Sequence, residues 1–307
     1  MVKHTPVLLD EVLEALDPIV NGRYLDCTFG GGGHTKALLD SASGVEVTSL
    51  DCDPDANPRA EPFKLQYGER FRFVDSNFHR MNEVVDGLFD GVLFDLGLSS
   101  FQLAEASKGF SFRLDAPIDM RLDPREGNAA SEFLETASNA SLIRAVREYG
   151  EERRWRRVVD AILAARGTGE LANTVSAARL VERAMGGSRS RIHPATKTFQ
   201  GIRIAINGEL ESLAMALPQA FRQLKVGGIL VVISFHSLED RITKRFFRRM
   251  AGRPEHKGDS ASVQDRLCHA KMLRTRASKP KAEEIERNPR SRSARLRAMR
   301  KLSDSNL

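Results

Sequence analysis

The sequence predicts an α/β protein built on a mostly parallel β-sheet, with a helical domain inserted into it. Short segments rich in β-branched and aromatic residues alternate with helix-length connections over residues 23–102, which is typical of βαβ units. Between Leu103 and Leu224 helical patterns replace this alternation, and a fifth strand pattern follows at residues 229–233. The economical interpretation is one sheet that the chain leaves after its fourth strand and rejoins at its fifth.

Each predicted strand is short, and most end near a polar residue. The five segments are residues 23–29, 45–50, 71–74, 91–94 and 229–233. The last reads ILVVI, and a continuously apolar run of this kind favours a parallel strand buried on both faces. Residues 271–276 and 294–299 are expected to add a final hairpin. We therefore expect a discontinuous sheet domain, residues 1–102 and 218–307, around a helical insertion, residues 103–217.

Helical periodicity locates the clearest helices. Apolar side chains recur at helical spacing over residues 5–16, 152–163, 176–185 and 202–217. Thr5 is expected to cap the first of these helices, with Pro6 in its first turn.

Composition favours a folded, soluble, cytoplasmic protein. Of the 307 residues 41% are hydrophobic, yet no run approaches the ~18 apolar residues of a membrane span. The first residues lack the pattern of a signal peptide. Cys27, Cys52 and Cys268 form no CxxC pair, which excludes a disulfide framework or a cysteine-rich zinc site as the organising feature. The histidines share no metal-ligand spacing, so we expect no metal.

The net charge of +6 is unevenly distributed along the chain. Residues 241–301 hold 20 Lys and Arg against 6 Asp and Glu, so the remainder is acidic overall. A basic C-terminal segment on an acidic body suggests a polyanionic partner. The alternative interpretation is a solvated, partly disordered tail.

A glycine-rich turn marks a candidate nucleotide site. Asp26 closes the first strand, four consecutive glycines at residues 30–33 follow, and Asp51 ends the second strand. Glycine permits close backbone approach to a ligand, and a terminal carboxylate can accept hydrogen bonds from ribose hydroxyls. The third glycine of a dinucleotide fingerprint is missing. Asp26 would suit the cationic methionine end of S-adenosylmethionine, so we expect that cofactor. The alternative is a tight structural turn beside a solvated aspartate.

Further sequence runs carry a family resemblance that extends in order over nearly the whole chain. They are residues 4–11 (HTPVLLDE), 24–34 (YLDCTFGGGGH), 90–97 (DGVLFDLG), 99–100 (SS) with Gln102, 109–112 (GFSF), 119–121 (DMR), 149–152 (YGEE), 193–200 (HPATKTFQ), 233–241 (ISFHSLEDR) and 288–294 (NPRSRSA). On these runs the chain closely resembles the bacterial 16S ribosomal RNA cytosine-N4 methyltransferases, the family of ribosomal RNA small subunit methyltransferase H.

The resemblance implies a class I S-adenosylmethionine-dependent methyltransferase fold, Rossmann-like, with an inserted helical domain. It implies S-adenosyl-L-methionine as methyl donor. It also implies, as target, the exocyclic amine of a cytosine in the decoding region of 16S rRNA of the small ribosomal subunit. The cofactor contacts that it implies are Gly32, Gly33, His34, Asp51, Phe78, Asp95 and Gln102.

Asp95 and His236 are the candidate catalytic residues. Asp95 ends the fourth strand, where it can accept a hydrogen bond from the amine and assist its deprotonation, or can contact the cofactor instead. His236 follows the fifth strand and can orient the base or relay a proton; the alternative is a histidine hydrogen-bonded within a loop. Glu239 and Asp240 are expected in the first turn of a helix, near its positive end.

The insertion and the basic C-terminal segment are expected to bind the RNA. Residues 153–157 read RRWRR, and Arg189, Arg191, His193 and Lys197 follow. Guanidinium groups hold phosphates and aromatic rings can stack on bases. The alternative for residues 153–157 is a solvated helix face with Trp155 in the core.

Other functions stay open at this point. A nicotinamide-dependent dehydrogenase is disfavoured by the missing glycine. A DNA amino-methyltransferase is disfavoured because no Pro-Pro-aromatic signature follows Asp95. A cofactor-binding ribosome-assembly factor without turnover, or a methyltransferase of another RNA, is the remaining alternative. The sequence does not distinguish naked RNA from an assembled subunit as substrate, and it leaves open whether the chain forms a homodimer.

Overall fold

The chain forms two compact units in this computed structural model, which describes residues 6–186, 193–260, 262 and 266–304. Unit 1 comprises Met1–Gly97 and Leu210–Leu307, and unit 2 comprises Leu98–Glu209. The predicted insertion, residues 103–217, overlaps unit 2, but its first and last residues both lie further along the chain than those of unit 2. Thr5, Arg189 and Arg191 lie outside the described residues.

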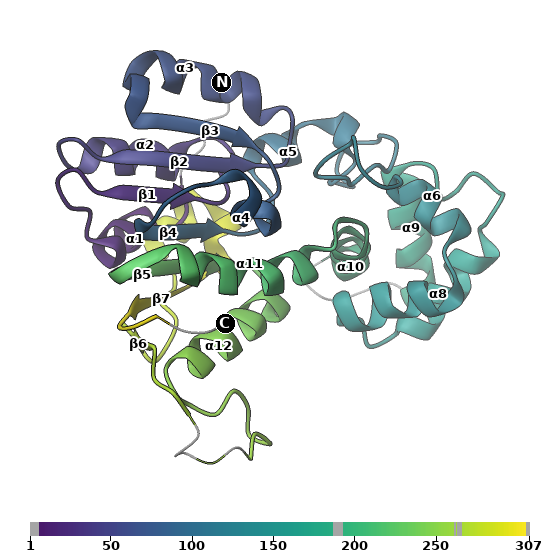
Figure 1. Cartoon of the computed structure of the whole chain (residues 1–307). Coiled ribbons are helices and arrows are strands. Elements are labelled where there is room, and N and C mark those ends of the chain that lie inside the picture. Colours follow the sequence, from purple (N-terminus) through teal and green to yellow (C-terminus); the bar gives the residue numbers. More distant parts are fainter. Residues whose placement is uncertain (1–5, 187–192, 261, 263–265, 305–307) are drawn as a thin grey trace. The chain divides into compact units, whose positions relative to one another are not determined.

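Unit 1 contains one seven-stranded sheet in the order β3-β2-β1-β4-β5-β7-β6 (Figure 1). The first five strands in this order are parallel, β7 runs antiparallel to β5, and β6 runs antiparallel to β7. This is the predicted α/β fold with its final hairpin. The strands are β1 (Arg23–Asp26), β2 (Glu46–Asp51), β3 (Phe71–Asp75), β4 (Phe89–Asp95), β5 (Leu224–Ser234), β6 (Ala270–Met272) and β7 (Arg295–Lys301).

Helices cover both faces of this sheet, because successive strand residues point into two different apolar clusters. Val232 belongs to the cluster under α4, α11 and α12, whereas Val231 belongs to the cluster under α1, α2 and α3. The helices of unit 1 are α1 (Leu9–Leu16), α2 (Gly33–Ser41), α3 (Ala56–Tyr67), η1 (Gly68–Arg70), η2 (Phe78–Arg80), α4 (Met81–Val84), α11 (Glu209–Gln223), α12 (Ser237–Met250), α13 (Ala282–Arg287) and η6 (Pro289–Ser293). Burial on both faces explains the apolar strand sequences.

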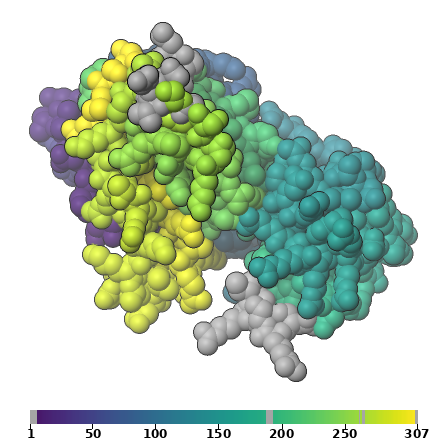
Figure 2. Space-filling model, turned by 90° about the horizontal axis from the view of Figure 1, so that it is seen from below, coloured from purple at the N-terminus to yellow at the C-terminus, as the bar shows by residue number. Residues whose placement is uncertain are grey.

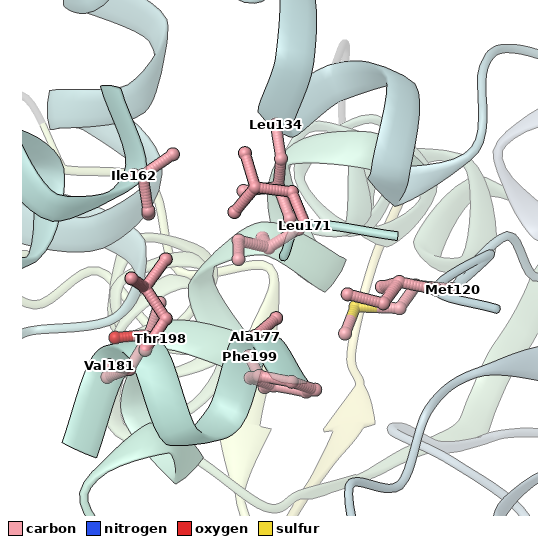
Figure 3. Close-up of a pocket in the computed structure, with 11 residues that line it drawn as sticks. Met120, Leu134, Ile162, Leu171, Ala177, Val181, Thr198 and Phe199 are labelled. Carbon is pink, nitrogen blue, oxygen red and sulfur yellow. The ribbon is translucent and has the colours of Figure 1, made fainter. Parts of the chain in front are cut away.

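Unit 2 is helical and has an apolar core of its own. Figure 3 shows a void in that core, between side chains such as Met120, Leu134, Ile162 and Phe199. The void measures about 10 Å³, which is too small for a ligand. The helices are α5 (Ser100–Ala104), η3 (Ala106–Lys108), α6 (Ala130–Thr136), α7 (Asn139–Ile143), the π-helix η4 (Arg144–Tyr149), α8 (Trp155–Ala164), α9 (Thr174–Met185) and α10 (Ala195–Asn207).

Two helix predictions were wrong, one because the segment contains a break and the other because the helix starts later in the chain. Residues 202–217 form no single helix, because α10 ends at Asn207 and Gly208 adopts a left-handed conformation with φ +56°. The Asn207 side chain accepts from the Leu122 N–H and donates to the Met120 carbonyl, which fixes this break. The first helix starts at Leu9, so Pro6 lies before the helix and not in its first turn, because Leu8 is left-handed with φ 55°.

A buried lysine joins the last strand to the start of β5. Lys301 is 2% exposed, and its Nζ donates to the Leu224 carbonyl at 2.7 Å and the Arg222 carbonyl at 3.4 Å. The same ammonium lies 5.3 Å from the centre of the Phe221 ring. It therefore satisfies carbonyl groups at the carboxyl end of α11 that are otherwise difficult to pair.

We expect Lys301→Met to lower the free energy of unfolding by about 2–3 kcal/mol, because it removes charged hydrogen bonds and leaves buried carbonyls unpaired. Lys271→Met, at an exposed position on the neighbouring β6, is the control, with an expected change of less than about 0.5 kcal/mol. Urea denaturation of both variants measures the difference, and equal midpoints would contradict the role given to Lys301.

Candidate active site

The turn between β1 and α2 depends on glycine for its conformation and its packing. Gly30 has φ +53° and Gly32 has φ +74°. A Cβ atom on Gly32 would lie 2.3 Å from the Phe63 ring, and one on Gly33 would lie 2.4 Å from Pro6. The two predicted cofactor-binding glycines are therefore required by the fold, and they leave the start of α2 without side chains that would cover its N–H groups.

Asp26, at the end of β1, is buried and stabilises this turn through hydrogen bonds. Its carboxylate is 1% exposed and accepts from the Thr28 N–H at 3.1 Å and the Thr35 hydroxyl at 2.7 Å. The Thr28 hydroxyl accepts from the Asp95 N–H at 2.7 Å, which ties the turn to the end of β4. Burial raises the pKa of Asp26, against the opposing effects of His34 and Thr35. Both Asp26 oxygens have partners in the chain, so Asp26 supports the turn.

Asp51 lies at the end of β2 with both carboxylate oxygens held by backbone donors. Oδ2 accepts from the Gly30 N–H at 2.7 Å, and Oδ1 accepts from the Asp53 N–H at 2.9 Å. Burial raises the pKa of Asp51 to about 6, although these N–H groups act in the opposite direction. Since a carboxylate oxygen has two lone pairs, each oxygen can accept one further hydrogen bond. That arrangement suits the two hydroxyls of a ribose.

His34, which is buried, and Asp95, whose side chain is 17% exposed, form a pair at the same edge of the sheet. His34 Nε2 lies 3.4 Å from Asp95 Oδ2, an ion-pair distance without hydrogen-bond alignment. Burial opposes the imidazolium, but Asp95, Asp26 and Glu284 outweigh burial and raise the pKa of His34. Asp95 Oδ1 is buried and has no hydrogen-bond partner within the described part of the chain. An unmet acceptor of this kind calls for a donor from a ligand.

Phe78 lies in η2, directly after β3. Its ring packs edge-to-face on Phe94 of β4, with 5.4 Å between centroids, and it remains partly exposed. The Asn77 side chain accepts from the His79 N–H and so fixes the start of η2. Phe78 therefore has a fixed and partly exposed ring in unit 1, which can contact a flat ring of a ligand.

Two predicted site residues have helix-capping roles. In unit 2, Gln102 forms a capping box with Ser99 at the start of α5. In unit 1, His236 caps α12: its Nδ1 accepts from the Glu239 N–H at 3.4 Å, and Glu239 Oε2 accepts from the His236 N–H at 3.2 Å. As expected, Glu239 and Asp240 lie in the first turn of α12.

These residues fit S-adenosylmethionine. Asp51 offers ribose acceptors, and the negative charge of this edge suits the ammonium and sulfonium groups of that molecule. A dinucleotide would instead bring a pyrophosphate close to these aspartates, and like charges at short distance repel.

Sequence reasoning missed Thr28, Thr35 and Arg59. The Arg59 Nε donates to the Gly30 carbonyl at 2.9 Å, and Thr35 shares a 2.8 Å hydrogen bond with Ser49. Thr28 could have been found, because it lies two residues after Asp26, a spacing typical of an Asx turn. The contacts of Thr35 and Arg59 are made only by folding.

Comparison with known proteins gives one consistent family. The model of the MraW methylase family matches residues 1–302. A ribosomal RNA small subunit methyltransferase H of Thermomicrobium roseum is 45% identical and aligns over 98% of this chain and 94% of its own. Proteins of the same name from Granulibacter bethesdensis and Rickettsia typhi are 42% and 43% identical, over 96% and 97% of this chain and 90% and 98% of their own. Among the described residues, no helix has the length and apolar character to cross a membrane.

The raised pKa of Asp51 predicts a pH dependence of cofactor binding. An ionised carboxylate accepts ribose hydrogen bonds best, so we expect the Kd for S-adenosylmethionine to rise as the pH falls through about 6, by up to ~tenfold per pH unit. Calorimetric titration between pH 5 and 8 measures the effect.

Asp51→Asn should weaken binding at pH 8 and flatten the pH dependence of the Kd. Asp75→Asn, at the end of neighbouring β3, is the matched control and should keep the wild-type curve. A wild-type curve in Asp51→Asn would contradict the role of Asp51.

Proposed function

This chain belongs to the MraW methylase family, and from that premise we propose that it methylates the N4 amine of a cytosine in the decoding region of 16S rRNA. The methyl donor is S-adenosylmethionine, and the substrate is the rRNA within the small ribosomal subunit. Relatives named for ribosomal RNA small subunit methylation, at 42–45% identity over nearly the full chain, support this assignment. The site of action is the cytoplasm, where ribosomes assemble.

The observation that carries the proposal is the orphaned acceptor Asp95 Oδ1. It is buried at the carboxyl end of β4, and His34 faces the other oxygen of the same carboxylate at 3.4 Å. An exocyclic amine presents N–H donors, which this oxygen can accept. The nitrogen lone pair of cytosine N4 is conjugated with the ring, so an acceptor on its N–H localises that pair and makes the amine a better nucleophile.

When bound, S-adenosylmethionine supplies a methyl group on a positively charged sulfur, which the amine takes over with loss of one N4 proton and release of a neutral thioether. Asp95 Oδ1 accepts that proton. His34 faces the second Asp95 oxygen at 3.4 Å, and this ion-pair contact favours a carboxylate orientation that leaves the first oxygen for the amine. Gly32, Gly33, Asp51 and Phe78 hold the adenosyl part, and Gln102, in unit 2, enters the proposal through the resemblance alone.

His236 is proposed to orient the target base. Its Nδ1 is used in capping α12, so the proton of the neutral ring is on Nε2, which is buried and makes no aligned hydrogen bond within the described residues. This Nε2–H group can donate a hydrogen bond to O2 or N3 of the cytosine, which are acceptors. The capping role fixes the ring, so the two roles are compatible.

Unit 2 is proposed to bind the RNA through its arginines. Arg153, Arg156 and Arg157 are exposed around the start of α8. Trp155 packs against the core of unit 2, and the Arg156 guanidinium lies 4.4 Å from its ring centre. The covered ring favours phosphate binding by the arginines over base stacking by Trp155.

The test is transfer of labelled methyl groups from S-adenosylmethionine to small ribosomal subunits from a strain that lacks this enzyme. We expect label in N4-methylated cytosine after digestion to nucleosides and mass spectrometry. Binding of the cofactor without any label in the rRNA would contradict the proposal and favour an assembly factor without turnover.

In the same assay Asp95→Asn should lower kcat by about two to four orders of magnitude, because it removes the proton acceptor. Its Kd for S-adenosylmethionine should stay within a few-fold of wild type. Asp86→Asn, an exposed carboxylate just before β4, is the control. A large loss of cofactor affinity with an unchanged kcat at saturation would instead make Asp95 a cofactor contact.

A further inference from the structure

The antiparallel strand β7 brings part of the basic C-terminal segment to the carboxyl edge of the sheet. Ser234, the last residue of β5, pairs with Arg295, the first residue of β7. Because these strands run in opposite directions, the residues after Ser234 and those before Arg295 leave the sheet at the same edge. The strands β1, β2 and β4 end at this edge with Asp26, Asp51 and Asp95.

At this edge unit 1 has a pocket of about 250 Å³. One side is formed by residues that follow β5, and the other by residues from two C-terminal segments. The lining residues are Phe235, His236, Ser237, Lys279, Arg292, Ser293, Ala294 and Arg295. In Figure 2 the C-terminal residues, in yellow, lie at the surface of unit 1.

The run NPRSRSA, residues 288–294, is folded so that its arginines stay outside. The Asn288 side chain accepts from the Arg290 N–H at the start of η6. Ser291 is fully buried and its hydroxyl donates to the Asn288 carbonyl at 2.8 Å, while Ala294 is 1% exposed. With Ser291 and Ala294 anchored inward, Arg292 is left exposed at the pocket.

Lys279 is positioned by backbone pairing. Ser278 and Leu296 exchange hydrogen bonds of 2.9 and 3.0 Å, so the residue after Ser278 is held close to Arg295. Lys279 and Arg292 are exposed, and neither forms an ion pair within the described residues. Arg295 is 45% exposed and pairs with Asp240 at 3.1 Å. The pocket therefore has two unneutralised cations.

One further feature makes the pocket suitable for an anion. The helix α12 begins at Ser237, which lines the pocket, so the positive end of a fourteen-residue helix lies in the wall. Glu239, in the first turn of this helix, accepts from the N–H groups of Phe235 and His236 with one oxygen, and His236 Nε2 lies 3.1 Å from the other, which offsets its charge.

We propose that this pocket binds a backbone phosphodiester of the RNA substrate beside the target nucleotide, with Lys279 and Arg292 as its principal contacts. The inference rests on the proposed function, because it names how the substrate is held at the same edge. Two cations that lack internal partners and a helix N-terminus in one pocket match the charge and the oxygen acceptors of a phosphate.

The test compares Lys279→Gln/Arg292→Gln with Arg276→Gln/Lys281→Gln. The control pair removes the same charge from exposed positions of the same segment that do not line the pocket. Binding is measured by fluorescence anisotropy with a single-stranded RNA of the decoding-region sequence and, separately, with small ribosomal subunits, at several salt concentrations and without S-adenosylmethionine.

We expect the pocket variant to raise the Kd for the RNA about tenfold. Its plot of log K against log salt should be shallower by about 0.7–1.4, the equivalent of one or two phosphate contacts. The control should change the Kd less than about twofold and keep the slope. The Kd for S-adenosylmethionine should be unchanged in both variants.

The other outcomes separate this inference from the proposed function. Methylation by wild type with equal RNA binding by pocket and control variants would overturn the phosphate pocket and leave the function intact. If the pocket variant binds RNA more weakly but the wild-type enzyme methylates no rRNA, the pocket is supported and the proposed function is overturned. Weaker binding to subunits alone would overturn the inference and indicate an acidic protein surface as partner.

Discussion

The balance of negative charge at the carboxyl edge of the sheet is the constraint on which the site depends. Parallel strands bring Asp26, Asp51 and Asp95 to the same edge, and burying carboxylates without partners is strongly unfavourable. Backbone N–H groups and the Thr35 hydroxyl stabilise the first two, and the His34 imidazolium stabilises the third. Burial nevertheless raises the pKa of both Asp26 and Asp51, against the opposing effect of these hydrogen bonds. A cationic ligand supplies further compensation, whereas a pyrophosphate would add to the repulsion.

The strand order β5-β7-β6 brings the positively charged C-terminal segment to the same edge of the sheet as the aspartates. An all-parallel sheet would need a crossover helix to return the chain, but antiparallel β7 delivers the C-terminal segment directly. Asp240 of α12 holds this segment in place through Arg295 and Arg297, and these guanidinium groups keep the pKa of Asp240 low despite its burial. The uneven charge of the sequence therefore has a structural meaning, because unneutralised cations of the basic segment line a pocket in unit 1.

The strands could be predicted because apolar runs that end in polar residues are local signals. Asp51 and Asp95 could be located as strand-end carboxylates for the same reason. The helix breaks at Leu8 and Gly208 could not be located, because each depends on a left-handed residue and on distant partners. The Leu8 N–H, for example, donates to Glu284, far away in the sequence. Sequence reasoning also offered His236 as a catalytic residue without its capping contact to Glu239, which only the folded geometry reveals.

The two opposite charges also explain how a polyanionic substrate can approach an acidic site. Phosphates are repelled by aspartates at short distance, and screening weakens that repulsion beyond about 8 Å in physiological salt. Under the proposed function, a cationic rim would attract the backbone of the RNA and hold it outside the buried edge, so that an uncharged base would be the part that enters. The base brings N–H donors, which the orphaned Asp95 Oδ1 can accept at little electrostatic cost. We therefore propose that selectivity for an amine nucleophile arises from the positions of these charges, with Lys279 and Arg292 holding the RNA backbone and Asp95, next to His34, accepting from the amine.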